Sequence, residues 1–110
     1  MTHLSAYRIM WIMALFDLPV VTSAERKRAG KFRLFLLDQG FEMVQLSVYA
    51  RFAFSREKAE AITRKIGKAV PAHGKVDILY FTDKQYAQIV SFRGQSESAL
   101  PKNPEQLALF

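Results

Sequence analysis

The sequence predicts an α+β sandwich whose elements follow the order strand, helix, strand, strand, helix, strand. Three observations support this prediction. A run of seven apolar residues, Met10–Phe16, is too uniformly apolar for a strand with one wet face, and it indicates a central strand. Segments 23–39 and 55–70 repeat apolar residues at helical spacing. Segments 41–54 and 75–82 are rich in β-branched and aromatic residues, which favour strands.

The first strand ends at an acidic residue, Asp17, and Pro19 follows it. Proline lacks a backbone donor and forces the preceding residue away from helical geometry, so the ladder stops here. Asp17 therefore lies at the rim where a central strand leaves the sheet. Such a carboxylate either caps the following loop or belongs to a functional site. Its position leaves both interpretations open.

The first helix is expected over residues 23–39. Thr22 and Glu25 have the spacing of a capping box at its start, and Gly40 supplies a left-handed cap after its end. One face of this helix should pack on the sheet, and its apolar members are Ala29, Phe32, Phe35 and Leu36. The second helix is expected over 55–70 and ends before Pro71.

The remaining segments predict strands and one turn. Residues 41–54 can form two short strands with a break near 45–47, and residues 75–82 form another. A turn or single helical loop should cover 82–85, and a last short strand 88–92. The βαββαβ order predicts a ferredoxin-like sandwich with this extra C-terminal strand. Residues 1–94 are assigned to this domain and 95–110 to a flexible C-terminal tail.

Both helices of such a sandwich cover the same face of the sheet. The first strand is apolar on both sides, so a monomer would leave its second apolar face in water. We therefore expect a homodimer packed sheet to sheet, with the extra strand available to extend the sheet of the partner.

Composition narrows the class of protein. The chain has 110 residues, enough for one domain, and no cysteine, which excludes disulfides, thiolate catalysis and cysteine zinc sites. The apolar run of seven residues is far shorter than the roughly 20 residues of a membrane span, so no membrane association is expected and a cytoplasmic location is favoured. The formal charge of +6 suits a polyanionic partner.

Two further segments have features of binding surfaces. One is the dense basic run of the first helix, which consists of Arg26, Lys27, Arg28, Lys31 and Arg33. This run is either a solvated helix face or a surface that contacts nucleic-acid phosphates without reading bases. The other is the end of the tail, where Leu107, Leu109 and Phe110 follow a polar tether and indicate partner binding.

Several motifs together resemble the CRISPR-associated protein 2 family, most of all its members from type II systems. They run from about residue 12 to residue 94, and it is their order and spacing that carry the resemblance. They are Leu15-Phe16-Asp17-Leu18-Pro19, Glu25-Arg26, Phe32-Arg33-x-Phe35-Leu36, Gly40-Phe41, Gln45-x-Ser47-Val48-Tyr49, Thr82-Asp83-Lys84-Gln85-Tyr86 and Gly94.

The resemblance implies a ferredoxin-like homodimer that takes part in spacer acquisition beside the integrase, CRISPR-associated protein 1. Double-stranded DNA, or single-stranded RNA, is the implied nucleic acid. Some members are metal-dependent endonucleases, which implies Mg²⁺ or Mn²⁺ bound by Asp17 and catalytic roles for Asp17 and Ser47. Basic residues early in the first helix correspond to Arg26 and Arg28. Met43 replaces an arginine that some members carry, which weakens the expectation of vigorous hydrolysis.

Three functions remain open from the sequence. The first is a DNA-binding scaffold that bridges two integrase dimers, and the second is a stand-alone metal-dependent endonuclease. The third is a toxin-like ribonuclease of the virulence-associated protein D type. One carboxylate is a poor Mg²⁺ site unless a twofold axis pairs two copies of Asp17. The other acidic candidates, expected to be solvated at turns or helix ends, are Asp38, Glu42, Asp77 and Asp83.

Overall fold

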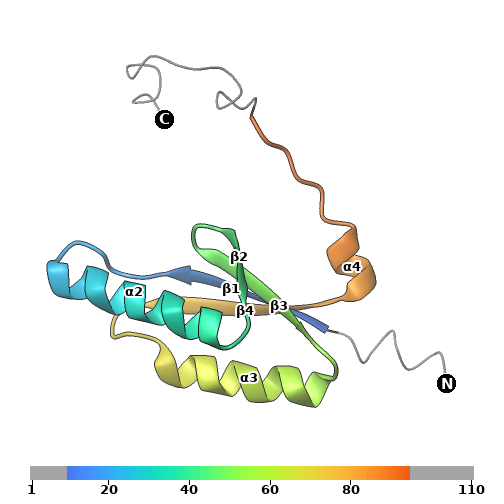
Figure 1. Cartoon of the computed structure of the whole chain (residues 1–110), viewed down its shortest axis with the longest axis horizontal. Coiled ribbons are helices and arrows are strands. Elements are labelled where there is room, and N and C mark those ends of the chain that lie inside the picture. The colour runs from blue at the N-terminus through green and yellow to red at the C-terminus, as the bar shows by residue number, and fades with distance from the viewer. Residues whose placement is uncertain (1–9, 95–110) are drawn as a thin grey trace.

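A four-stranded antiparallel sheet with two helices on one face forms most of the described structure. A computed structural model describes residues 10–94 of the chain (Figure 1). Its elements are β1 (Met10–Asp17), α2 (Ser23–Asp38), β2 (Glu42–Gln45), β3 (Val48–Ala53), α3 (Arg56–Ala69), β4 (Lys75–Thr82) and α4 (Asp83–Ala87). The strand order is β2-β3-β1-β4, so the prediction that the first apolar run forms a central strand is confirmed. This order is consistent with the ferredoxin-like sandwich predicted from the sequence.

Strand pairing fixes which side chains share a face of the sheet. β1 pairs antiparallel with β3, from Met10 opposite Ala53 to Leu15 opposite Val48. On its other edge β1 pairs antiparallel with β4, and Asp17 lies opposite Lys75. Because successive residues of a strand point to opposite faces, even-numbered residues of β1 face the helices and odd-numbered residues face away.

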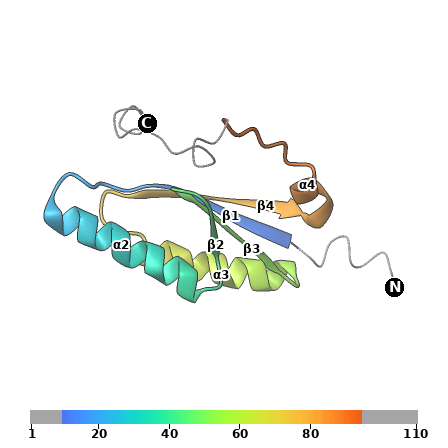
Figure 2. The same ribbon diagram turned by 45° about the horizontal axis from the view of Figure 1, so that its top comes forward.

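The hydrophobic core lies between the sheet and the two helices, which occupy the same side of the sheet in Figure 2. Ile12 and Ala14 of β1 are fully buried there. The helical stripe predicted for α2 packs against them, and α3 adds Ile62 and Ile66. Burying one isoleucine, leucine or phenylalanine side chain stabilises the fold by about 1.5–3 kcal/mol. The two helices are therefore held on the sheet mainly by this apolar layer.

Local signals set the start of α2 as predicted. The Glu25 backbone N–H donates to Thr22 Oγ1 at 3.1 Å, and the Thr22 N–H donates to Glu25 Oε1 at 2.9 Å, which closes a capping box. The hydrogen bond from the Thr22 N–H lowers the pKa of the Glu25 carboxyl below its ordinary value. This stabilisation is therefore present above the ordinary glutamate pKa and is lost as the pH falls through the lowered one.

The end of α2 also follows the sequence signal. Gly40 adopts a φ of 88°, a left-handed conformation that favours glycine. Arg51 of β3 donates a hydrogen bond from Nη1 to the Gln39 carbonyl oxygen, which satisfies one acceptor at this helix end. The predicted break within residues 41–54 falls at residues 46–47, between β2 and β3.

The predicted last strand, residues 88–92, is wrong for the single chain. Trp11 stacks on Tyr86 at a ring-centroid distance of 3.9 Å, and its Nε1 donates to Asp83 Oδ1 at 3.0 Å, so α4 is held at the end of the sheet. Residues 88–94 then leave on the side opposite α2 and α3 (Figures 1 and 2). A strand requires a hydrogen-bonded neighbour. Within the described part of the chain, no strand pairs with this segment.

None of the helices in residues 10–94 is both long enough and apolar enough to cross a membrane.

Replacing Thr22 with alanine should lower the free energy of unfolding by about 1 kcal/mol, because one backbone donor of α2 loses its cap. Urea denaturation followed by circular dichroism measures the change. The matched control is Thr82→Ala, which removes the same capping box from the five-residue α4. A loss for Thr22→Ala no larger than that for Thr82→Ala would contradict the importance of this cap.

Candidate functional site at the end of the sheet

Asp17 lies at the end of β1 beside a hollow of about 310 Å³ in the sheet surface. The hollow is lined by Leu15, Phe16, Asp17, Ser47, Val48, Lys75 and Asp77. Asp17 is exposed, whereas Leu18 after it is buried. A Cβ on Gly74 would come within 2.6 Å of Leu18 Cδ2, so the turn before β4 packs closely against this exit of β1. The contact between this turn and Leu18 therefore holds the strand end that carries Asp17 in place.

Ser47, paired with Asp17 by the resemblance, lines the same hollow. It belongs to the turn between β2 and β3, and its carbonyl oxygen accepts a hydrogen bond from the Phe16 N–H at 3.0 Å. This bond holds the turn next to the end of β1. The two predicted catalytic residues thus come together from separate elements, although their chemical roles remain predictions.

Asp77 is a second carboxylate in the hollow that the sequence did not single out as a site residue. The expectation that it lies at a turn or helix end is wrong, because it is inside β4 opposite Leu15. Lys75 Nζ lies 3.6 Å from Asp77 Oδ2. Asp17 and Asp77 are diagonal neighbours across the β1–β4 ladder, a relation typically spanning about 7–8 Å. Only the register between β1 and β4 reveals that Asp17 and Asp77 are neighbours.

The donors in the hollow suit a weak Mg²⁺ site better than a closed metal cage. Within residues 10–94, no three His, Cys, Asp or Glu side chains gather in a metal-binding arrangement. Mg²⁺ commonly keeps several waters and takes one or two protein carboxylates together with substrate phosphates. Asp17 and Asp77 fit that pattern, while the Lys75 ammonium group competes for Asp77.

An apolar surface extends from this hollow across the side of the sheet opposite α2 and α3, and Tyr86 of α4 stacks on Trp11 at its far end. We call it the open face, and it consists of Trp11, Met13, Leu15, Val48, Phe52, Leu79 and Phe81. Phe52 and Leu79 are each 39% exposed, and Trp11, Met13 and Leu15 are half-buried. Contiguous apolar surface of this kind usually marks an interface. Asp17 and Asp77 lie at one end of the open face.

The basic residues of α2 lie on the helix side of the sheet, and they divide between two flanks of the helix. Arg26 Nη1 donates to the carbonyl oxygens of Val20 and Val21 at 3.2 and 2.8 Å. The Arg33 guanidinium lies 5.8 Å from the centre of the Phe16 ring.

Lys27, Arg28 and Lys31 are exposed on the other flank of α2. The five cations therefore form two groups instead of one continuous stripe, as expected from about 3.6 residues per turn. The tail residues Leu107, Leu109 and Phe110 lie outside the described residues, and their assignment stays a prediction.

Comparisons with known proteins point to one family. A family model described as CRISPR associated protein Cas2 matches residues 10–89. A protein of Paracidovorax avenae named CRISPR-associated endoribonuclease Cas2 is 50% identical over 107 residues, which is 97% of this chain and 99% of that protein. A Flavobacterium psychrophilum protein of the same name is 46% identical over 109 residues, which is 99% of this chain and 95% of that protein.

Solved structures agree with the fold. The crystal structure of Streptococcus pyogenes Cas2 matches with a TM-score of 0.55 and 19% identity, covering 76% of this chain and 99% of that one. Another Cas2 crystal structure matches with a TM-score of 0.58 and 18% identity, covering 86% of this chain and 98% of that one. At these identities the likeness bears on the arrangement of strands and helices alone.

Proposed function

Because the chain belongs to the CRISPR associated protein Cas2 family, we propose that it binds nucleic acid as a homodimer and bridges integrase dimers during spacer acquisition. The observation that carries this proposal is the open face, an apolar surface with a carboxylate hollow at one end. Relatives named as endoribonucleases support a CRISPR role and nuclease activity for this chain as well.

The proposed dimer follows from the cost of leaving the open face in water. Two copies packed sheet to sheet would remove Met13, Leu79 and their neighbours from solvent in each chain, and apolar burial yields about 25 cal/mol per Å². A twofold axis running parallel to β1 through such an interface would bring a second Asp17 to the same end of the assembly. Residues 88–94 leave on this side of the sheet and would meet the partner's edge.

Phosphodiester hydrolysis is the activity that the hollow would support. Mg²⁺ or Mn²⁺ would supply an activated water and neutralise charge on the phosphate. In this proposal Asp17 holds the ion, Ser47 positions the substrate, and Lys75 places a positive charge beside the phosphate.

The departure at Met43 favours the scaffold over the nuclease. Met43 is 58% exposed and stands where some family members have an arginine, so the positive charge of that arginine is missing here. The scaffold function needs the dimer and the basic helix but not Asp17. A stand-alone metal-dependent or toxin-like ribonuclease, the alternative function, needs Asp17 and a metal ion.

The integrase is the proposed protein partner. Leu107, Leu109 and Phe110 are apolar residues after a polar tether, and a short segment of this kind commonly adds to a sheet edge or fills a groove of its partner. Double-stranded DNA is the proposed nucleic acid, with single-stranded RNA as the substrate of any hydrolysis.

The variant Asp17→Asn distinguishes the scaffold function from the nuclease function. Any Mg²⁺-dependent cleavage of single-stranded RNA by the purified protein should fall by at least about a hundredfold, the scale for losing one key electrostatic group in an active site. Spacer acquisition in cells, measured by sequencing the array, should continue. The control is Asp38→Asn, the same change at an exposed residue at the end of α2. Loss of acquisition with Asp17→Asn but not with the control would contradict the scaffold function.

Replacing both Arg26 and Arg33 with alanine should weaken binding to duplex DNA uniformly across sequences, because phosphate contacts carry no base information. A plot of log affinity against log salt has a slope of about −0.9 per phosphate contact, so its magnitude should fall by roughly 2 per protomer. Fluorescence anisotropy over a salt series measures this slope.

The matched control for that experiment removes the same charge from the neighbouring helix, by replacing Lys65 and Lys68 with alanine. Both control residues are exposed on α3. The slope of log affinity against log salt for this Lys65/Lys68 variant should stay near that of the wild type. If the Arg26/Arg33 variant keeps the wild-type slope, this flank of α2 is merely solvated and DNA binds elsewhere.

A further inference from the structure

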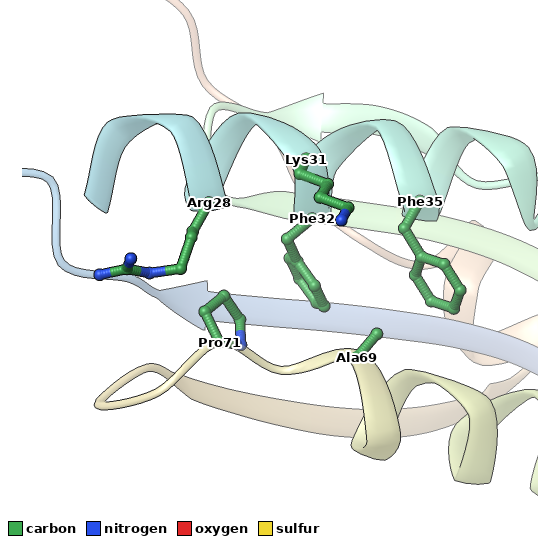
Figure 3. A pocket seen from close by; sticks show the side chains of 6 residues that line it. All are labelled: Arg28, Lys31, Phe32, Phe35, Ala69 and Pro71. Carbon is green, nitrogen blue, oxygen red and sulfur yellow. The ribbon is translucent and has the colours of Figure 1, made fainter. Parts of the chain in front are cut away.

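A groove between α2 and the end of α3 has no role in the function proposed above. It has a volume of about 330 Å³ and is lined by Arg28, Lys31, Phe32, Phe35, Ala69 and Pro71 (Figure 3). It opens on the helix side of the sheet, away from the Asp17 hollow and the open face. The volume is at the lower end of the range for small-ligand pockets, about 300–1,000 Å³, so it suits a few side chains. We call it the α2–α3 groove.

The walls of the groove combine apolar surface with positive charge. The rings of Phe32 and Phe35 lie 6.3 Å apart at an angle of 27° and form the apolar wall on α2. Arg28 and Lys31 come from the same helix and lie at the rim. Within residues 10–94, neither of these two cations forms a salt bridge. The groove therefore favours an occupant with apolar side chains next to a carboxylate.

We propose that the occupant is the segment Pro104–Phe110 of this same chain. Glu105 is followed at two-residue steps by Leu107 and Leu109. In an extended conformation these three side chains would point to one side, since alternate residues share a face. Glu105 then pairs with Arg28 and Lys31 at the rim, and the two leucines pack against the apolar wall of the α2–α3 groove.

The length of the chain sets the reach of this segment. Leu107 follows Gly94 by thirteen residues, and an extended chain covers at most about 3.3–3.6 Å per residue, so Leu107 can lie up to roughly 45 Å from Gly94. Docking would cover Lys31 and Arg28, two of the cations assigned to nucleic acid. The tail and a nucleic acid would then compete for this flank of α2. Because Leu107 and Leu109 are also the residues proposed to bind the integrase, docking in the α2–α3 groove would compete with that partner as well.

Disulfide trapping in the full-length chain tests this proposal directly, because the sequence contains no cysteine. The test variant carries Ala69→Cys and Leu107→Cys, and oxidised glutathione serves as the oxidant. The control carries Leu46→Cys and Leu107→Cys, since Leu46 is 74% exposed in the turn between β2 and β3 and does not line the groove. Docking should raise the rate of intrachain disulfide formation at least about tenfold over the control, through a higher effective concentration.

A charge swap checks that the contact is specific. Glu105→Lys in the trapping variant should slow disulfide formation to the control rate, and adding Lys31→Glu with Arg28→Glu should restore it. Non-reducing gels and intact mass distinguish a disulfide within one chain from one between two chains. Equal rates for test and control, a disulfide only between chains, or no restoration by the swap would each overturn the proposal.

Discussion

The constraint on which this structure depends is that β1 is apolar on both sides, while α2 and α3 cover only one of these sides. Ile12 and Ala14 meet α2 and α3 and form the core. Met13 and Leu15 carry the same apolar character to the open face, where no element of the described chain covers them. A strand with this composition in the centre of a sheet is stable only if its second face is also removed from water. The proposed dimer satisfies this requirement.

The carboxylates of the hollow and the cations of α2 lie on opposite sides of the sheet. Asp17 and Asp77 lie at the end of the open face, whereas the cations of α2 lie on the helix side. A polyanion bound along α2 therefore approaches the protein without passing the carboxylates. Arg33 is held over the Phe16 ring, so its guanidinium is partly ordered before any ligand binds. In the proposed function, this separation would allow one small domain to offer both a phosphate-binding surface and a carboxylate site.

Features set by neighbours in the sequence could be predicted, and features set by distant strands could not. The start of α2 follows from Thr22 and Glu25, and its end from Gly40, because caps act within one turn. Asp77 was missed as part of the site because its place depends on the register between β1 and β4. The strand predicted at 88–92 is not formed because this segment leaves the sheet after α4 and pairs with neither edge strand, β2 or β4.

The most direct test of this account is the molar mass of the full-length chain in solution, measured by light scattering at micromolar concentration. Burial of the open face predicts about 25 kDa, twice the 12.6 kDa of one chain. Met13→Glu should give 12.6 kDa with an unchanged circular dichroism spectrum, whereas Leu34→Glu, on a residue that is 63% exposed on α2, should leave the dimer intact. A wild-type mass of 12.6 kDa, or a dimer that survives Met13→Glu, would contradict the account.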